Sequence, residues 1–423
     1  MPHFQRGHVP AFLINRNFAL FTLGSFVAAT GSWSAAVAIG WLVLELGNST
    51  FLLGLAGFAQ MIPLLVLSYP AGALSDRVDR RKIMLLAQVG GLAVATVLTG
   101  TALLGLVSIP LILLASLAMG VFNALAWPVW TVFIKDLVGP ENLRRAVALN
   151  AVRFNITRVI GPVIAGWLLA QFGATTCLVV STACIVPMIG AIVVIRTTPP
   201  PRREPEPWLP ALKLGVSYSW GTPHVRELLL TAGVIGLLVM PWQNFLPSFA
   251  RDILRAGPQG YGWLLAAIGA GAVAGAFATG HPLISRSPRQ ALAIFALLSG
   301  VSLTLFALST SLWLSLVTCA GVGFASIAFM VVANATLQLS VRDDLIGRVM
   351  GLYTVVNAGV MPVGSLIQGA ISEQVTLATT VAGAGIGAAL LGVLLARQTV
   401  RGGAGARAYS ESPEPTGKAE APG

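Results

Sequence analysis

A charged interruption, Gly72-Ala73-Leu74-Ser75-Asp76-Arg77-Val78-Asp79-Arg80-Arg81-Lys82, separates two long apolar stretches of this sequence. Every residue from Asp76 to Lys82 except Val78 carries a charge. Each flanking stretch is long enough to cross a lipid bilayer, which takes about 20 apolar residues. The charged run therefore predicts a loop at a membrane surface that joins two membrane-spanning helices.

The composition supports a membrane protein. The chain has 423 residues, of which 56% are hydrophobic and only 10% are charged, a balance that the surface of a soluble domain of this length does not tolerate. The net charge is +11, but the basic residues lie in short loops between apolar stretches, which is typical of membrane orientation. We therefore expect the lipid bilayer as a partner and no nucleic acid.

The apolar runs predict an all-α membrane protein with twelve transmembrane helices in two six-helix halves. The predicted spans cover residues 18–44, 51–74, 83–107, 110–134, 146–170, 175–195, 228–250, 259–283, 290–308, 312–337, 348–371 and 376–396. The predicted parts are a cytoplasmic N-terminus (1–17), an N-terminal half (18–195), a Pro-rich cytoplasmic linker (196–227), a C-terminal half (228–396) and a disordered cytoplasmic tail (397–423).

The distribution of basic residues predicts the orientation. If the loop from Gly72 to Lys82 is cytoplasmic, Arg251 and Arg255 are the only two of the 26 lysines and arginines assigned to loops on the opposite side. Arg153 and Arg158 are the only two assigned to the inside of a span. This asymmetry follows the positive-inside rule and places both termini in the cytoplasm.

The two halves resemble each other at a shift of about 200 residues, which is a pattern of transporters built from internal repeats. The counterpart of the first charged loop is Gly280-His281-Pro282-Leu283-Ile284-Ser285-Arg286, and it has no acidic residue where the first loop has Asp76. We therefore expect the two loops to act differently.

Two six-helix halves, a basic central linker and the loop Gly72-x-Leu74-Ser75-Asp76-Arg77-x-Asp79-Arg80-Arg81-Lys82 resemble the major facilitator superfamily. Further runs are similar to its branch of enterobactin exporters and macrolide efflux proteins: Gly31-Ser32-Trp33, Trp41-Leu42-Val43-Leu44-Glu45-Leu46, Ala148-Leu149-Asn150, Phe154-Asn155-x-x-Arg158-x-x-Gly161-Pro162, Gly347-Arg348-Val349-Met350 and Pro362-x-Gly364-Ser365. The resemblance implies a secondary active exporter that works by alternating access, by proton antiport and without a cofactor.

In this superfamily the signature loop meets the eleventh helix. We expect a conformational latch, made of Gly72, Asp76, Arg77, Arg80 and Arg348, that closes the cytoplasmic side in the outward-facing state. Gly72 permits close packing, and Asp76 can accept hydrogen bonds from Arg348 or from free helix N–H groups. The alternative is that these charges only solvate the loop, which we favour for Arg80, Arg81 and Lys82.

The predicted fifth helix carries two arginines. Arg158 lies too deep for its side chain to reach the interface easily, whereas Arg153 either faces a cavity or extends to the cytoplasmic interface. We expect a substrate cavity lined by Arg158, Arg153, Asn155, Asn150, Gln60, Asn123, Trp33, Asn357 and Tyr353. The alternative is that Arg158 pairs with an amide such as Gln60, Asn123 or Asn357 and is structural.

The same helix contains Gly161-Pro162-x-x-x-Gly166, which resembles a motif of exporters in this superfamily. Proline removes a backbone hydrogen bond and glycine permits close packing, so these residues predict a bendable, leak-tight interface. The alternative is an ordinary kinked packing helix, because both residues are frequent in membrane helices.

None of the 15 acidic residues falls in the middle of a predicted span. Arg158 therefore has no obvious ionic partner in the protein. A lipophilic cation would favour a buried carboxylate, so this favours an anionic or polar-neutral substrate, such as a siderophore or a macrolide. Glu45 and Glu373, near extracellular helix ends, are the possible proton sites.

The sequence has no phosphate-binding loop, no HExxH or GxSxG motif and no His/Cys cluster, so we expect neither an enzyme nor a metal site. We expect a monomer in the cell (inner or plasma) membrane. The alternatives to an exporter are an importer or facilitative permease and, from another class, a transport-inactive sensor or scaffold.

Overall fold

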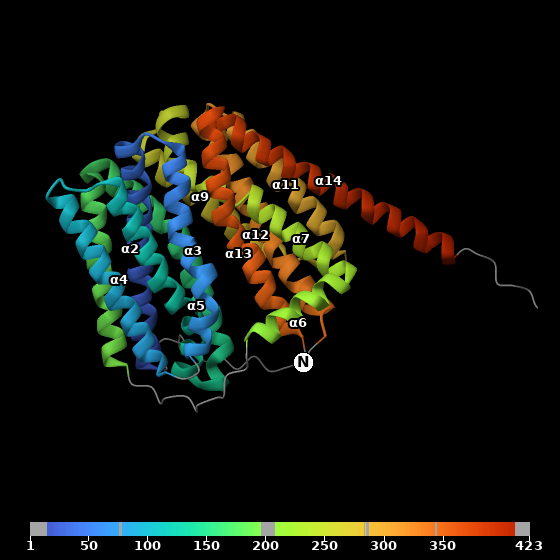
Figure 1. Cartoon of the computed structure of the whole chain (residues 1–423), viewed down its shortest axis with the longest axis horizontal. Coiled ribbons are helices and arrows are strands. Elements are labelled where there is room, and N and C mark those ends of the chain that lie inside the picture. The colour runs from blue at the N-terminus through green and yellow to red at the C-terminus, as the bar shows by residue number, and fades with distance from the viewer. Residues whose placement is uncertain are drawn as a thin grey trace, which may run out of the picture.

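Long helices of the computed structural model form two bundles that lie side by side (Figure 1). The structure describes residues 15–75, 78–195, 208–282, 284, 287–342 and 345–410. The N-terminal half contains α2 (Arg16–Gly47), α3 (Thr50–Ser75), α4 (Arg80–Leu103) and α5 (Ile109–Val194). The C-terminal half contains α7 (Pro223–Leu238), α9 (Gly257–Ala278), α11 (Pro288–Leu308), α12 (Leu312–Ser340), α13 (Ile346–Gln374) and α14 (Leu377–Ser410).

The described part of the chain contains 10 helical segments long and apolar enough to cross a membrane. One of them, α5, is three crossings in sequence, because the backbone leaves the helical conformation at Gly139 (φ 70°) and at Gly173 (φ 80°). Glycine adopts these positive φ angles without the steric penalty of a side chain. The expected all-α fold of twelve spans is therefore confirmed.

The first crossing of the C-terminal half is irregular. After α7 the chain continues through a 3-10 turn (Pro241–Phe245), the short α8 (Leu246–Ser248) and a π-helical turn (Phe249–Ile253) before α9 begins. Pro241 and Pro247 have no N–H to donate to a regular helix, which accounts for the change of pitch. The result is a compact corner that carries Arg251.

Two segments are more helical than the sequence suggests. The linker expected over 196–227 contains α6 (Trp208–Gly221), which packs against α13 and places Gly215 against the backbone of Arg348. The tail expected to be disordered from 397 is helical as far as Ser410, where α14 ends.

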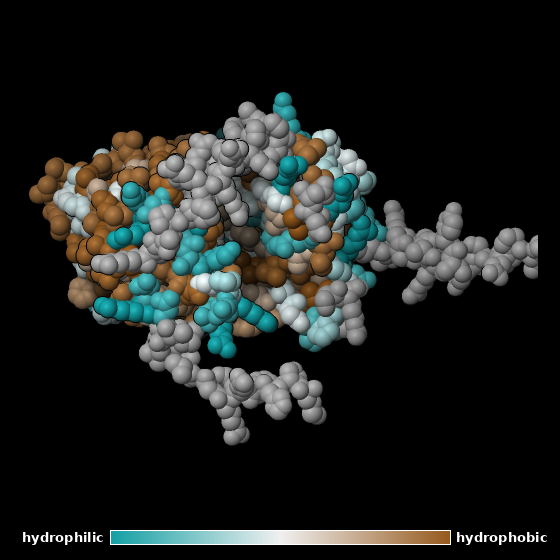
Figure 2. Space-filling view, turned by 90° about the horizontal axis from the view of Figure 1, so that it is seen from below, coloured by the Kyte–Doolittle hydropathy of each residue, from teal (hydrophilic) through white to brown (hydrophobic). Residues whose placement is uncertain are grey.

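The helices run between two ends of the molecule. The Asn48 end is where α2 passes into α3, and the Asp79 end is where α3 passes into α4. Figure 2 looks onto the Asp79 end and shows a hollow near its centre with hydrophilic side chains gathered beside it. Many large apolar side chains elsewhere on the molecule are exposed, for example Leu23, Phe277 and Trp313. An apolar exterior with a polar end is the pattern of a protein embedded in lipid.

Candidate functional site

The second crossing of α5 packs directly on α9, so the two halves touch along these helices. A Cβ atom on Gly166 would lie 2.7 Å from the Cα atom of Gly262, and one on Gly262 would lie 2.6 Å from the carbonyl oxygen of Pro162. Only residues without a side chain allow backbones to approach this closely. Two residues of the motif expected to form a tight interface, Pro162 and Gly166, therefore lie between the halves.

The third residue of that motif has a different neighbour. A side chain on Gly161 would collide with the ring of Trp33 on α2, so Gly161 makes room for an indole within the N-terminal half. Trp33 is partly buried there. The motif thus packs on both sides, toward α2 and toward the other half.

A second contact between the halves joins α3 to α13. A Cβ atom on Gly369 would lie 3.1 Å from both the Cα atom of Phe51 and the carbonyl oxygen of Thr50. Gly54 packs in the same way on the carbonyl of Ser365, whose hydroxyl accepts a 2.6 Å hydrogen bond from Asn244. These close approaches lie on the side of the Asn48 end.

Arg158 lies where α5 meets α9. A Cβ atom on Gly269 would lie 2.5 Å from the carbonyl oxygen of Arg158 and 3.4 Å from its Cγ atom. The side chain is half-buried, and within the described residues its guanidinium has no hydrogen bond or ion pair. No hydrogen bond joins it to Gln60, Asn123 or Asn357 in that part of the chain. A buried cation without an internal partner is available to an anionic or polar ligand.

Arg153 is bound inside the N-terminal half. Its side chain donates 2.9 Å hydrogen bonds to the carbonyl oxygen of Ser25 and to Oδ1 of Asn150, and its guanidinium lies 5.6 Å from the ring centroid of Trp130. The residue is only 8% exposed. Arg153 therefore does not extend to the membrane surface, because α2 and α5 hold its two terminal nitrogens, while its Nε is buried without a hydrogen-bond partner among the described residues.

The remaining residues expected in the cavity are dispersed. Asn155 donates to the carbonyl of Ala151 on its own helix, and Asn123 is exposed. Gln60 is partly buried on α3, where its backbone lies close to Gly120. In the other half, Asn357 donates a 3.3 Å hydrogen bond to the hydroxyl of Tyr353, which donates to the carbonyl of Met330.

The expected latch is described only in part. Asp76 and Arg77 lie outside the described residues, and Gly72 lies in the last turn of α3. Nη1 of Arg80 donates hydrogen bonds of 2.8–2.9 Å to both carboxylate oxygens of Asp136 in its own half, so Arg80 does more than solvate the loop. Arg348 lies at the start of α13, where its backbone meets α6.

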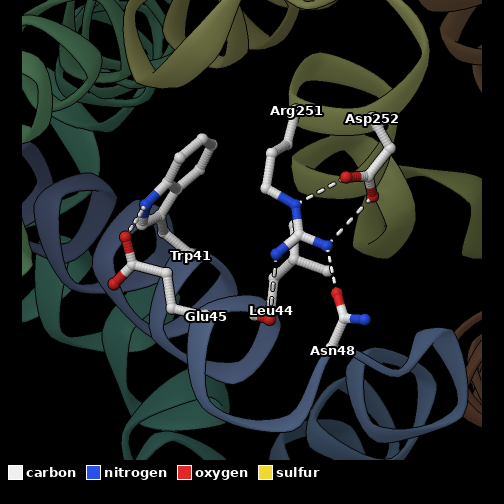
Figure 3. Close-up of polar contacts among 6 residues, drawn as sticks. All are labelled: Trp41, Leu44, Glu45, Asn48, Arg251 and Asp252. Carbon is white, nitrogen blue, oxygen red and sulfur yellow. Dashed lines mark hydrogen bonds and ion pairs between the residues drawn. The ribbon is translucent and has the colours of Figure 1, made fainter.

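Glu45 and Glu373 both lie at the Asn48 end, but only Glu373 contacts the other half. Glu45 accepts a 2.5 Å hydrogen bond from Nε1 of Trp41, on its own helix (Figure 3). Glu373 of α13 accepts hydrogen bonds from the hydroxyls of Ser49 and Thr50 and from the N–H of Phe51. Glu373 is thus placed where separation of the halves would change its environment.

Arg251 makes the corresponding contact from the irregular corner and was not among the expected site residues. It donates to the carbonyl oxygen of Leu44 (3.1 Å) and to Oδ1 of Asn48 (2.5 Å), while Asp252 holds its Nε at 2.6 Å (Figure 3). The sequence contained one signal for it, because Arg251 and Arg255 are the only basic residues in loops of that side.

A pocket of about 390 Å³ lies elsewhere, at the Asp79 end of the C-terminal half between α7, α11, α12 and α14. Its polar lining includes His224, Glu227, Arg289 and Ser340. None of the residues expected in the substrate cavity lines this pocket, and it is separate from the contact between the halves. Among the described residues, no group of three or more His, Cys, Asp or Glu is placed to hold a metal ion.

Comparisons with known proteins agree on the kind of molecule. Residues 10–419 match the sequence model of the transmembrane secretion effector family. The multidrug efflux pump Tap of Mycolicibacterium fortuitum is 28% identical over 387 residues, which are 89% of this chain and 94% of that protein. The enterobactin exporter EntS of Shigella boydii is 28% identical over 383 residues, which are 89% of this chain and 90% of that protein.

Solved structures share the fold at low sequence identity. The nucleoside transporter NupG superposes with a TM-score of 0.72 at 12% identity, covering 90% of this chain and 98% of its own. A bacterial homologue of the human lysosomal transporter Spinster, in an inward-facing and unoccupied conformation, gives 0.69 at 15% identity, covering 93% and 99%. These likenesses show the fold alone.

Proposed function

This chain belongs to the transmembrane secretion effector family of major facilitator transporters, and we propose that it exports a small anionic or polar-neutral molecule by alternating access. The observation that carries the substrate class is Arg158, a half-buried cation between the halves without a hydrogen bond or ion pair to any described residue. A ligand oxygen can supply the missing partner. A siderophore or a macrolide fits this chemistry, and the relatives include an enterobactin exporter and a multidrug efflux pump.

We propose that the protein is a monomer in the inner or plasma membrane of the cell. In the proposed orientation the Asp79 end faces the cytoplasm. Basic residues concentrate at that end, as the positive-inside rule requires. The contacts between the halves described above lie from the Asn48 end to about the middle of the spans. In this orientation the structure represents a state open to the cytoplasm, from which an exporter loads its substrate.

Proton antiport is the proposed energy source, with Glu373 as the first candidate to carry the proton and Glu45 as the second. Both glutamates are exposed, but Glu373 bridges the halves through three hydrogen bonds, whereas Glu45 is bonded within its own helix. Protonation of a carboxylate removes its capacity as a charged acceptor, so it would loosen the contact made by Glu373. Binding of a proton from outside the cell to Glu373 would thereby favour opening of the Asn48 end.

The latch between Asp76 and Arg348 is proposed for the opposite, outward-facing state. Its support is the sequence motif and the position of Arg348 at the start of α13, where the partial positive charge of a helix N-terminus favours an anion. Arg80 is bound to Asp136 in this state, so we assign it to the support of the loop within the N-terminal half.

The test is counterflow in proteoliposomes that contain the purified protein, with a catecholate siderophore, a macrolide and a cationic dye, each with and without a pH gradient. We expect the siderophore or the macrolide to be preferred and the gradient to accelerate net export. A strong preference for the dye would contradict the substrate class. Cells that lack the protein should retain more of the compound if it is an exporter and less if it is an importer, and an absence of flux would favour a scaffold.

A further inference from the structure

The two helices that meet at the Asn48 end lack charged residues that would stabilise their ends. The last turn of α2 contains no basic residue, and the first turn of α3 contains no acidic residue. The C-terminal end of a helix carries a partial negative charge and the N-terminal end a partial positive charge. A cation at the C-terminal end of α2 and an anion at the N-terminal end of α3 would therefore stabilise this corner.

The C-terminal half supplies the cation. Arg251 donates to the carbonyl oxygen of Leu44 in the last turn of α2, which also accepts from the N–H of Asn48, and to the side chain of Asn48. Asn48 ends the helix in the left-handed conformation (φ 43°, ψ 36°), and this exposes the corner to Arg251. Asp252 fixes the guanidinium from its other edge (Figure 3).

The C-terminal half also supplies the anion. The carboxylate of Glu373 accepts a 3.1 Å hydrogen bond from the N–H of Phe51 in the first turn of α3 and a 2.6 Å hydrogen bond from the hydroxyl of Ser49. Ser49 in turn accepts from the N–H of Leu52, so it caps the helix that Glu373 reaches. Ser372 adds a 2.7 Å hydrogen bond to Thr50 beside this contact.

We propose that Arg251 and Glu373 act as a clamp that holds the Asn48 end closed by capping both ends of the α2–α3 corner from the opposite half. A cap from within the same half would stabilise the helix ends equally in the open and closed states and would not bias the equilibrium. A cap from the opposite half is lost when the halves separate, so its whole free energy favours the closed state. Both residues are thus positioning residues of the transport cycle, and this role rests on the proposed function. The effect of the clamp on the open and closed conformations does not depend on transport.

The test measures the distance between spin labels at Leu106 and Ser311, which lie in the two halves beside the Asn48 end. The native cysteines Cys177, Cys184 and Cys319 are replaced first. We expect R251Q and E373Q each to raise the ratio of open to closed Asn48 ends roughly tenfold, since tenfold corresponds to ~1.4 kcal/mol, at the lower edge of hydrogen bonds to charged groups. The double variant should open further.

Two controls separate the clamp from general effects. R255Q removes a positive charge from the same end of the molecule as R251Q. Arg255 is exposed and lies outside the contact that Arg251 makes with α2, so R255Q should leave the distances between the spin labels unchanged. T50D/E373A restores an acidic residue to the first turn of α3 from within its own half. It should recover the thermal stability lost in E373A without recovering the closed population.

The proposal is overturned if R251Q and E373Q keep the parent distance distribution, if R255Q shifts it as much, or if T50D/E373A restores closure. These outcomes concern conformation and need no substrate. If no compound is transported but the distances shift as described, the clamp stands and the proposed function fails.

Discussion

Gly166 of the N-terminal half and Gly262 of the C-terminal half lie against each other, so closely that a Cβ atom on either would approach the Cα atom of the other to 2.7–2.8 Å. No side chain separates the two backbones at this point. The contact explains in physical terms why Gly166 can lie so close to the other half, because a glycine from each side is needed for this approach.

Replacement of Gly166 by alanine should weaken the closed contact. Real Cβ atoms do not tolerate 2.7 Å to a backbone carbon, so α5 and α9 must shift apart, at a cost typical of overpacking, about 1–3 kcal/mol. We expect a larger open population at the Asn48 end and a lower thermal midpoint, measured by label distances and by thermal unfolding in detergent.

Gly190 provides the matched control for this prediction. It also lies in α5, but a Cβ atom there would meet nothing within 4 Å. G190A should therefore keep or slightly raise stability, since alanine favours the helix by up to ~1 kcal/mol over glycine. Equal losses for G166A and G190A would show that the close approach has no special role.

Replacement of Arg158 by glutamine should reduce transport without unfolding the protein. The guanidinium has no hydrogen bond or ion pair within the described residues, so its loss leaves no described group unpaired. We expect the KM for an anionic substrate to rise about tenfold, as the loss of a charged hydrogen bond requires. R144Q, at an exposed basic residue of the same helix near the break at Gly139, should leave KM unchanged, and a similar rise there would point to a general charge effect.

Replacement of Arg153 by glutamine should act on stability instead. Arg153 is 8% exposed and holds Ser25 and Asn150 through two hydrogen bonds, so the substitution should cost about 2–4 kcal/mol. Chemical unfolding in mixed micelles measures this loss. A variant as stable as the parent, with altered substrate selectivity, would place Arg153 in the cavity after all.

The contrast between the two arginines shows how far the sequence leads. Apolar spans of about 20 residues predict twelve crossings, since length and hydropathy suffice to identify them. The same pattern marks Arg153 and Arg158 as buried but does not assign their roles. The difference depends on whether the carbonyl of Ser25, 128 residues away, lies within reach, and this is a property of the packed bundle.

The clamp lay beyond sequence analysis for the same reason. Glu373 was recognisable as an acidic residue at a helix end, but its partners Ser49 and Phe51 are 324 and 322 residues away. Arg251 lies on a π-helical turn that no periodicity predicts, because the change of pitch follows from local prolines. Local patterns identify the helices, and contacts between distant helix ends determine which charges meet.

The proposed latch and clamp should oppose each other. The latch of Asp76 and Arg348 favours the state with the Asp79 end closed, and the clamp of Arg251 and Glu373 favours the state with the Asn48 end closed. In R251Q/E373Q, which populates the open Asn48 end, addition of D76N should therefore return the label distances toward those of the parent, because both states lose their specific stabilisation. K82Q, which removes a charge from the same loop, should have no such effect. If D76N leaves the distances of R251Q/E373Q unchanged, Asp76 does not stabilise the opposite state, and the proposed latch is wrong.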